Sequence, residues 1–241
     1  MSNQIHVAVF GAAGRMGAHI CAAVDAADDL TLVAKIDAGD SRDAALSADV
    51  VVDVTSPDSV MSNISWCIEH GKHMVIGTSG FTADRISEVQ RIAGANPTVS
   101  ILICPNFSIG AILMMRWAQQ AAQYFPDVEV IEYHHSAKVD APSGTAVRTA
   151  QMIGGAREAT LAVNRDGHAH GQVVDGVNVH SVRGDGFLAH QDVIFGGPGE
   201  RLTVRHDSLD RASFMPGALL GIRGVATLSG VTVGLESLLD L

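Results

Sequence analysis

Short apolar runs alternate with helical patterns along the N-terminal part of the chain, and this alternation limits the possible fold more than any other feature. The apolar runs cover residues 5–10, 30–34, 50–54, 73–76 and 99–103. Strands that are apolar on both faces belong to parallel sheets that helices cover on each side. The sequence therefore predicts a doubly wound, Rossmann-type α/β domain. Only residues 37–49 separate the second and third runs, so we expect a short or loop-like connection there.

A different pattern begins after about residue 107. Helical patterns cover residues 109–123, 145–153 and 212–225, and extended runs cover 128–135, 177–183, 188–195 and 201–206. We interpret the last three runs as antiparallel strands of a second, α+β domain with a mixed or antiparallel sheet. The final helical pattern is expected to return to the first sheet. The polar, glycine-rich stretch 154–176 is expected to be a mobile loop.

Composition excludes several classes of protein. Asp and Glu number 26 against 16 Lys and Arg, and without a basic stripe a net charge of -10 argues against a nucleic-acid partner. The three cysteines have no CxxC spacing, so we expect reduced, buried thiols. The N-terminus lacks the features of a signal peptide, and Asn, Pro and Gly interrupt the uncharged stretch 93–115. We therefore expect a cytoplasmic protein without a membrane span.

Three glycines, Gly11, Gly14 and Gly17, lie between the first apolar run and the first helical pattern. Glycines at such a turn permit a tight bend and the close approach of a pyrophosphate, which then lies at the N-terminus of the helix. The turn therefore predicts a dinucleotide-binding site. Its spacing is GxxGxxG where the usual motif has GxGxxG, so a purely structural turn is the alternative.

Asp37 follows the second apolar run, about 20 residues beyond the last of these glycines. An acidic side chain at this point hydrogen-bonds the hydroxyls of the adenosine ribose. It also repels a 2′-phosphate, so NADH should be accepted at least as well as NADPH, although Arg15 could offset the repulsion. The alternative for Asp37 is a solvated carboxylate at a strand end.

Two more loops follow apolar runs, Gly77-Thr78-Ser79-Gly80 and Cys104-Pro105-Asn106-Phe107. Open α/β sheets bind ligands at the carboxyl ends of their strands, where both loops are predicted to lie. Ordinary loop chemistry is an equally good explanation of their composition.

The segment from Glu129 to Ala146 has the most informative chemistry. Its extended run ends in His134 and His135, Lys138 follows, and Ser143-Gly144-Thr145 opens a helix. Cationic side chains beside the N-terminus of a helix attract a carboxylate, and His and Lys can exchange protons with a substrate. The alternatives are a zinc site, for which no third ligand stands at a regular spacing, and a solvated strand end.

The run His134-His135-x-x-Lys138-x-Asp140-x-Pro142-Ser143-Gly144-Thr145 resembles the signature of the dihydrodipicolinate reductase family, now named for its 4-hydroxy substrate. Similar segments at residues 11–17, 77–81, 105–110 and 207–214 extend the resemblance over nearly the whole chain. It implies reduction of 4-hydroxy-tetrahydrodipicolinate to tetrahydrodipicolinate with NADH or NADPH, on the diaminopimelate route to lysine. It also implies a homotetramer.

The resemblance assigns roles by position. His134 matches the catalytic histidine and Lys138 the proton-donating lysine of the family. The residues that match its substrate contacts are His135, Ser143, Gly144 and Thr145. The residues that match its cofactor contacts are Gly11, Ala12, Ala13, Gly14, Arg15, Met16, Asp37, Gly77, Thr78, Ser79, Cys104, Pro105, Asn106 and Phe107. No residue is assigned to a metal.

These assignments make residues 1–106 with 217–241 a dinucleotide-binding domain, and residues 107–216 a domain for substrate binding and oligomerisation. Two positions depart from the family, which often has Thr in place of Ser79 and Ala in place of Cys104. Neither change should abolish binding if backbone groups make those contacts. The short link after Asp37 resembles that of a bacterial branch in which both cofactors serve.

Two other functions fit parts of the pattern. Another two-domain dehydrogenase of amino-acid metabolism, of the homoserine or aspartate type, would share the cofactor half without needing the histidine signature. A nicotinamide sensor that does not turn over would bind the cofactor but would have no use for the proton donor Lys138.

Overall fold

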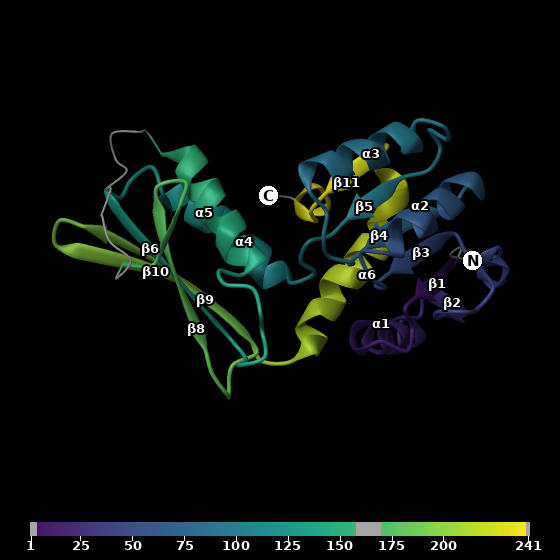
Figure 1. Ribbon diagram of the computed structural model, residues 1–241, viewed down its shortest axis with the longest axis horizontal. Helices are drawn as coiled ribbons and strands as arrows, with labels where there is room; N and C mark the ends of the chain where they lie inside the picture. Colours follow the sequence, from purple (N-terminus) through teal and green to yellow (C-terminus); the bar gives the residue numbers. More distant parts are fainter. Residues whose placement is uncertain (1–3, 158–169, 240–241) are drawn as a thin grey trace. The chain divides into compact units, whose positions relative to one another are not determined.

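The computed structural model describes residues 4–157 and 170–239 of the 241-residue chain. The chain forms two compact units. Unit 1 comprises Met1–Ile109 and Phe214–Leu241, and unit 2 comprises Gly110–Ser213. Each unit is built on its own sheet (Figure 1).

Unit 1 contains a six-stranded parallel sheet of order β11-β5-β4-β3-β1-β2. The strands are β1 (Ile5–Phe10), β2 (Leu30–Ile36), β3 (Val50–Asp53), β4 (His73–Ile76), β5 (Ile101–Ile103) and β11 (Val231–Val233). The apolar runs therefore form the predicted doubly wound sheet. The sequence patterns missed β11, which is only three residues long.

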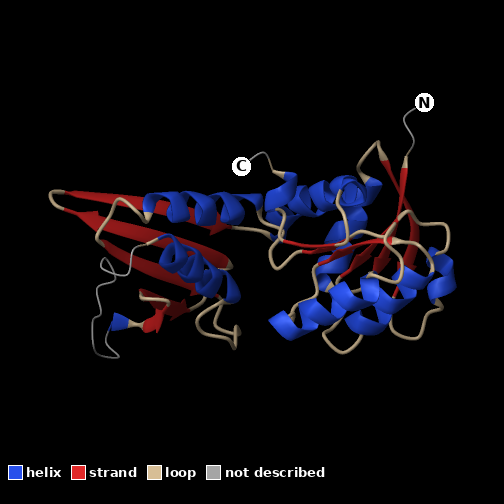
Figure 2. Cartoon of the chain, turned by 90° about the horizontal axis from the view of Figure 1, so that it is seen from above, coloured by secondary structure: helices blue, strands red, loops and turns tan. Residues whose placement is uncertain are grey.

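Helices cover both faces of this sheet (Figure 2). Helices α1 (Arg15–Asp25) and α6 (Met215–Gly224) contact each other on one face, and α2 (Val60–Glu69) and α3 (Ala83–Ala93) contact each other on the opposite face. The return of α6 to β4 confirms the predicted position of the C-terminal helix. The link between β2 and β3 contains only a short 3-10 helix, η1 (Arg42–Ala45), as predicted. Two further 3-10 helices close the unit, η5 (Val225–Thr227) and η6 (Glu236–Leu238).

Unit 2 contains a five-stranded mixed sheet of order β10-β9-β6-β8-β7. Its elements in chain order are α4 (Ile109–Ala121), β6 (Asp127–His134), α5 (Gly144–Ala156), β7 (Gln172–Val174), β8 (Val177–Arg183), β9 (Ala189–Gly197), β10 (Glu200–Ser208) and η4 (Arg211–Phe214). Helix α5 contacts β6, β7 and β8. The predicted α+β class is confirmed.

The three runs predicted as antiparallel strands are β8, β9 and β10. Strand β9 is antiparallel to β10 and to β6, and β8 is antiparallel to β7 but parallel to β6, so the sheet is mixed. The parallel pair follows from the helix α5 between β6 and β8, because a crossover connection joins parallel strands. The ends of the stretch 154–176 are also regular, since α5 continues to Ala156 and β7 begins at Gln172. The middle of the predicted loop, residues 158–169, lies outside the described residues.

All three cysteines are free and buried, as predicted. The uncharged stretch 93–115 divides into the end of α3, strand β5, a loop and the start of α4. In residues 4–157 and 170–239, no helix combines the length and the apolar character that crossing a membrane requires.

Candidate functional site

The turn between β1 and α1 needs glycine at two positions. Gly11 has a positive φ of 81°, and a Cβ there would lie 2.8 Å from the carbonyl oxygen of Val54. A Cβ on Gly17 would lie 2.0 Å from the carbonyl oxygen of Gly11, so only glycine lets α1 approach the turn this closely. The backbone N–H of Gly11 donates to the carbonyl of Ile36 at 2.7 Å, which joins the turn to the end of β2.

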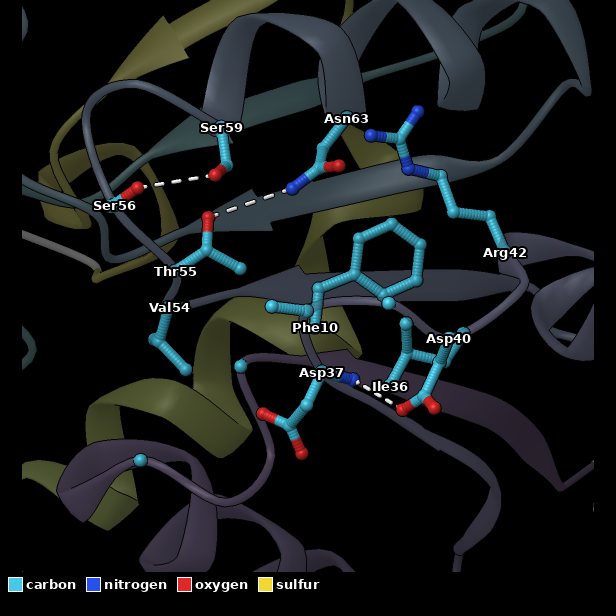
Figure 3. Close-up of a pocket in the computed structure, with 14 residues that line it drawn as sticks. Phe10, Ile36, Asp37, Asp40, Arg42, Val54, Thr55, Ser56, Ser59 and Asn63 are labelled. Carbon is cyan, nitrogen blue, oxygen red and sulfur yellow. Dashed lines mark hydrogen bonds between the residues drawn. The ribbon is translucent and has the colours of Figure 1, made fainter.

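A pocket of about 410 Å³ opens at the carboxyl ends of β1, β2 and β3 (Figure 3). It is lined by Phe10, Gly11, Gly14, Ile36, Asp37, Ala38, Gly39, Asp40, Arg42, Val54, Thr55, Ser56, Ser59 and Asn63. Of these lining residues, Gly11, Gly14 and Asp37 were predicted to contact the cofactor. The location at a strand-order reversal, between β1 and β3, is the place where sheets of this class bind ligands.

Asp37 is bonded to the glycine-rich turn. Its two carboxylate oxygens accept from the backbone N–H of Ala13 at 3.1 and 3.0 Å, and its own N–H donates to Asp40 at 2.8 Å. Two carboxylates, Asp37 and Asp40, thus line the pocket together with one cation, Arg42 (Figure 3). The guanidinium of Arg42 donates to the hydroxyl of Ser62 at 2.8 Å.

Polar residues after β3 also line the pocket, and sequence reasoning missed them. They are Thr55, Ser56, Ser59 and Asn63. Open α/β sheets bind ligands at the carboxyl ends of their strands, and this rule indicated the loops after the fourth and fifth strands. It applies equally to the third strand, so it could also have indicated the segment Val54-Thr55-Ser56.

Asp53, the last residue of β3, holds this region together. It is fully buried, and its Oδ1 accepts from the N–H and the hydroxyl of Thr55 at 3.0 and 2.8 Å and from the hydroxyl of Thr78 at 2.7 Å. Its Oδ2 accepts from the amide of Asn63 at 2.7 Å. The carboxylate therefore ties the pocket to the predicted loop after β4.

The loops after β4 and β5 pack against each other. A Cβ on Gly77 would lie 2.3 Å from the ring of Phe107, which is buried. Cys104 is also buried, its N–H donates to the carbonyl of Ile76 at 2.7 Å, and burial raises the pKa of its thiol. The side chain of Asn106 accepts from the N–H of Ser108 at 2.8 Å.

The other predicted cofactor residues differ in exposure. Ala12 and Thr78 are buried and Met16 is half-buried, whereas Ala13, Arg15, Ser79 and Pro105 are exposed. None of these seven residues lines the pocket beside β1, β2 and β3.

In unit 2, one strand–loop–helix segment contains all the residues predicted for the reaction. His134 ends β6, and His135 and Lys138 lie in the following loop, where the N–H of Lys138 donates to the carbonyl of His135 at 3.1 Å. Ser143 caps α5, its hydroxyl accepting from the N–H of Ala146 at 3.2 Å.

The N-terminus of α5 is open beside Gly144. Apart from Gly144 itself, its chain neighbours and the nearby backbone of α5, no described atom lies within 4 Å of the position that a Cβ of Gly144 would occupy, and Thr145 is half-buried next to it. Helix N-termini attract anions through their exposed N–H groups and the helix dipole. This segment can therefore receive a carboxylate.

Lys138 forms an ion pair with Asp140 within the loop. The Nζ atom lies 2.7 and 2.9 Å from the two carboxylate oxygens, and its hydrogen bonds lower the pKa of Asp140. The side chain of Asp140 is 58% exposed, so the pair is accessible to solvent and to a bound molecule.

Glu132 and Arg183 belong to this site, although the sequence patterns did not indicate them. Glu132 is buried on β6 and accepts from Nδ1 of His134 at 2.5 Å. Arg183, at the end of β8, donates to both carboxylate oxygens of Glu132 at 2.9 and 2.8 Å. Glu132 could have been found from the sequence, because it is a charged residue at a strand position that faces the core. No feature of the sequence around Arg183 indicates that it belongs to this site.

The metal alternative has no geometric support in the part of the chain that the structure describes. Within residues 4–157 and 170–239, no group of three or more His, Cys, Asp or Glu side chains is arranged to hold a metal ion.

Two family models together match almost the whole chain. The model described as dihydrodipicolinate reductase, N-terminus, matches residues 5–107, and the model described as dihydrodipicolinate reductase, C-terminus, matches residues 110–239. The chain belongs to the dihydrodipicolinate reductase family.

Individual relatives of this family agree over the full length. A protein of Thermobifida fusca named 4-hydroxy-tetrahydrodipicolinate reductase is 56% identical over 99% of this chain and 100% of its own. A protein of Nocardia farcinica with the same name is 54% identical over 98% of this chain and 99% of its own. A dipicolinate-bound dihydrodipicolinate reductase from Paenisporosarcina sp. TG-14 superposes with a TM-score of 0.85, at 35% identity, over 98% of this chain and 100% of that one.

Proposed function

We propose that this chain catalyses the reduction of 4-hydroxy-tetrahydrodipicolinate to tetrahydrodipicolinate with NADH or NADPH, a step toward diaminopimelate and lysine. One observation carries the proposal: a histidine, a lysine and an open helix N-terminus occur in a single strand–loop–helix segment of unit 2. The full-length relatives that bear this enzyme's name support it.

Unit 1 is proposed to bind the cofactor. The close packing at Gly11 and Gly17 leaves the N-terminus of α1 beside the pocket, which suits a pyrophosphate, and Asp37 suits the ribose hydroxyls. The further predicted contacts, residues 77–79 and 104–107, follow β4 and β5 at the same edge of the sheet. When bound, a nicotinamide cofactor supplies the hydride.

Unit 2 is proposed to bind the substrate by its two carboxylates. The N–H groups of Gly144 and Thr145 at the start of α5 donate to one carboxylate, with Ser143 shaping the turn, and His135 contacts the substrate beside it. His134 and Lys138 are then placed to supply the proton. The balanced reaction takes one hydride and one proton into the ring system and releases the hydroxyl group as water.

A coupled assay tests the proposal. The substrate is generated from pyruvate and aspartate semialdehyde by its synthase, and oxidation of NADH and of NADPH is followed separately at about 340 nm, where reduced nicotinamides absorb. We expect substrate-dependent oxidation of at least one cofactor. Folded protein that binds NADH without any turnover would overturn the reductase function and favour a sensor.

The proton-transfer residues give a second test. His134→Ala and Lys138→Ala should each lower kcat by about 100- to 10,000-fold, the usual contribution of a positioned acid or base. Lys35→Ala is the matched control, because Lys35 is 58% exposed on β2 and pairs only loosely with Asp25 at 3.8 Å. Unchanged turnover in both site variants would contradict the assignment.

We also propose a cytoplasmic homotetramer. The outer face of the sheet in unit 2 presents half-buried apolar residues such as Ile131 and Ile194, which suits contact between copies. Free cysteines suit a reducing compartment. Light scattering should give a mass about four times the 25.2 kDa of one chain, and a monomeric mass would contradict the tetramer.

A further inference from the structure

Glu132 occupies a position where an apolar residue is expected. Strand β6 alternates between buried and half-buried residues, and Glu132 falls in register with Val128 and Val130 on the buried face. Its side chain is 0% exposed. A buried carboxylate is costly unless charged or hydrogen-bonding partners compensate it, so its partners should reveal why it is there.

The partners make Glu132 an obligatory hydrogen-bond acceptor. Burial raises the pKa of Glu132, but hydrogen bonds from His134, Arg183 and Ser181 outweigh burial and lower the pKa to about 2. The ionised carboxylate can only accept, so the Nδ1 atom of His134, 2.5 Å away, must carry a hydrogen. The contact therefore selects the Nδ1–H form of neutral His134 and leaves Nε2 as the nitrogen that exchanges a proton.

Arg183 fixes the carboxylate in turn. Arg183 is the register partner of His134 across the parallel β6–β8 pair, and its Nη1 and Nη2 donate to Oε2 and Oε1 of Glu132. Such a two-point contact fixes the plane of the carboxylate as well as its position. The direction of the bond to His134 is thereby set.

The same pair reaches both ends of the loop that carries Lys138. Oε1 of Glu132 accepts from the N–H of Ser143 at 3.2 Å, at the start of α5. Nη2 of Arg183 donates to the carbonyl of Asp140 at 2.6 Å. One ion pair, between the buried Glu132 and the half-buried Arg183, thus contacts the histidine, the lysine loop and the helix N-terminus.

We propose that Glu132 and Arg183 are positioning residues of the reaction: Glu132 sets the tautomer of His134, and Arg183 holds Glu132 and tethers the Lys138 loop to the sheet. The inference rests on the proposed reductase function, because the assignment of His134 and Lys138 to the reaction comes from it. Neither Glu132 nor Arg183 needs to touch the substrate to act in this way.

Glu132→Gln tests the first role. Arg183 still requires an acceptor, so the glutamine oxygen should face Arg183 and its NH₂ group should face His134, whose Nδ1 must then accept. The ¹⁵N signals of His134 are assigned as those lost in His134→Gln. In Glu132→Gln we expect their chemical shifts to change from the values of the Nδ1–H tautomer to those of the Nε2–H tautomer. We expect kcat to fall roughly 10- to 100-fold, as for other carboxylates that orient a functional histidine, with a smaller change in KM.

Glu129→Gln is the matched control. Glu129 lies on the same strand and accepts from Nε2 of His180 at 2.7 Å, but it belongs to the alternate set of β6 positions and does not contact His134. Its variant should keep the wild-type kcat and the wild-type His134 signals. A Glu132→Gln protein with both properties unchanged would overturn the proposal.

Arg183→Lys tests the second role and remains informative if Glu132→Gln does not fold. Lysine keeps the positive charge but cannot contact both carboxylate oxygens and the Asp140 carbonyl together. We expect the Nδ1–H form of His134 to persist, while KM and the Kd of dipicolinate, measured by calorimetry, rise about tenfold because the loop is released. An unchanged Kd and KM would overturn the tether.

The two proposals can fail separately. Absence of turnover in the wild-type chain would remove the reductase function, while the ¹⁵N spectra would still report whether Glu132 sets the tautomer. Normal wild-type turnover with no effect of either variant would remove only the positioning roles.

Discussion

Under the proposed function, Asp37 is expected to influence the choice between NADH and NADPH, because it lines the pocket where an adenosine ribose is proposed to lie. Asp37→Asn keeps an oxygen that can accept from the N–H of Ala13 but removes the charge that repels a 2′-phosphate. We expect the ratio of kcat/KM for NADPH to kcat/KM for NADH to rise on the order of tenfold, which corresponds to about 1.4 kcal/mol.

Asp43→Asn provides the comparison for this prediction. Asp43 lies on the same connection, is exposed and does not line the pocket, yet its replacement changes the net charge equally. In Asp43→Asn the ratio of kcat/KM for NADPH to kcat/KM for NADH should stay within about twofold of wild type, because exposed charges outside the pocket are screened by solvent and salt. Equal ratios in the two variants would show that Asp37 acts only through overall charge.

Single residues also show how far the site could be predicted. The position of Asp37 beside the glycine-rich turn could be predicted because its distance from the glycines is a local property of the chain. The proximity of His134 and Lys138 could be predicted because they share one short segment. Arg183 could not, since it contacts Glu132 from 51 positions away through the register of β6 and β8. The sequence contains no local trace of that pairing.

At the scale of elements, the turn before α1 is the part of the fold most sensitive to a single added carbon. In Gly17→Ala the new Cβ would lie 2.0 Å from the carbonyl oxygen of Gly11 and 2.8 Å from Cα of Ala12, both backbone atoms. Helix α1 would have to move away, at a cost of about 1–3 kcal/mol in the free energy of unfolding. We expect a lower thermal midpoint and weaker NADH binding by fluorescence titration.

Gly155→Ala in α5 is the control, because it adds the same Cβ atom where the Cβ would not meet the backbone of another segment. Apart from its chain neighbours and the nearby backbone of α5, no described atom lies within 4 Å of the Cβ position of Gly155. The variant should therefore be neutral or more stable by up to about 1 kcal/mol, the helix propensity of Ala over Gly. A Gly17→Ala protein as stable as Gly155→Ala would contradict the role of close packing.

Elements differ in how well the patterns predicted them. Strands β1 to β5 are mostly apolar, and β1, β3, β4 and β5 are largely buried, so burial on both faces explains their composition. Strands β7 and β11 have three residues each, too few to show a period. Strand β8 lies beside β6 and runs parallel to it because the crossover helix α5 connects the two strands. The alternation of residues within 177–183 does not indicate this direction.

At the scale of the whole molecule, the Glu132–Arg183 pair should make stability depend on acid. The pKa of Glu132 lies near 2 in the folded chain and near 4.5 as its ordinary value. A carboxyl with a lowered folded pKa stabilises the fold above its unfolded pKa, and this contribution is lost as pH falls from about 4.5 to about 2. Complete loss of this contribution lowers the free energy of unfolding by about 3 kcal/mol, and about 2 kcal/mol of it is already lost at pH 3.

Urea unfolding of the wild-type chain and Glu132→Gln at about pH 6 and pH 3 measures this contribution, because linear extrapolation gives a free energy at each pH. A Trp66→Phe background leaves Trp117 of α4 as the reporter, in the same unit as Glu132. Glutamine does not titrate, so the free-energy difference between the two proteins should shrink by about 2 kcal/mol at the lower pH, while other acidic groups cancel. A difference that stays constant would mean that the pKa of Glu132 is the same in the folded and the unfolded chain, so that its contacts with His134 and Arg183 do not favour the ionised carboxylate.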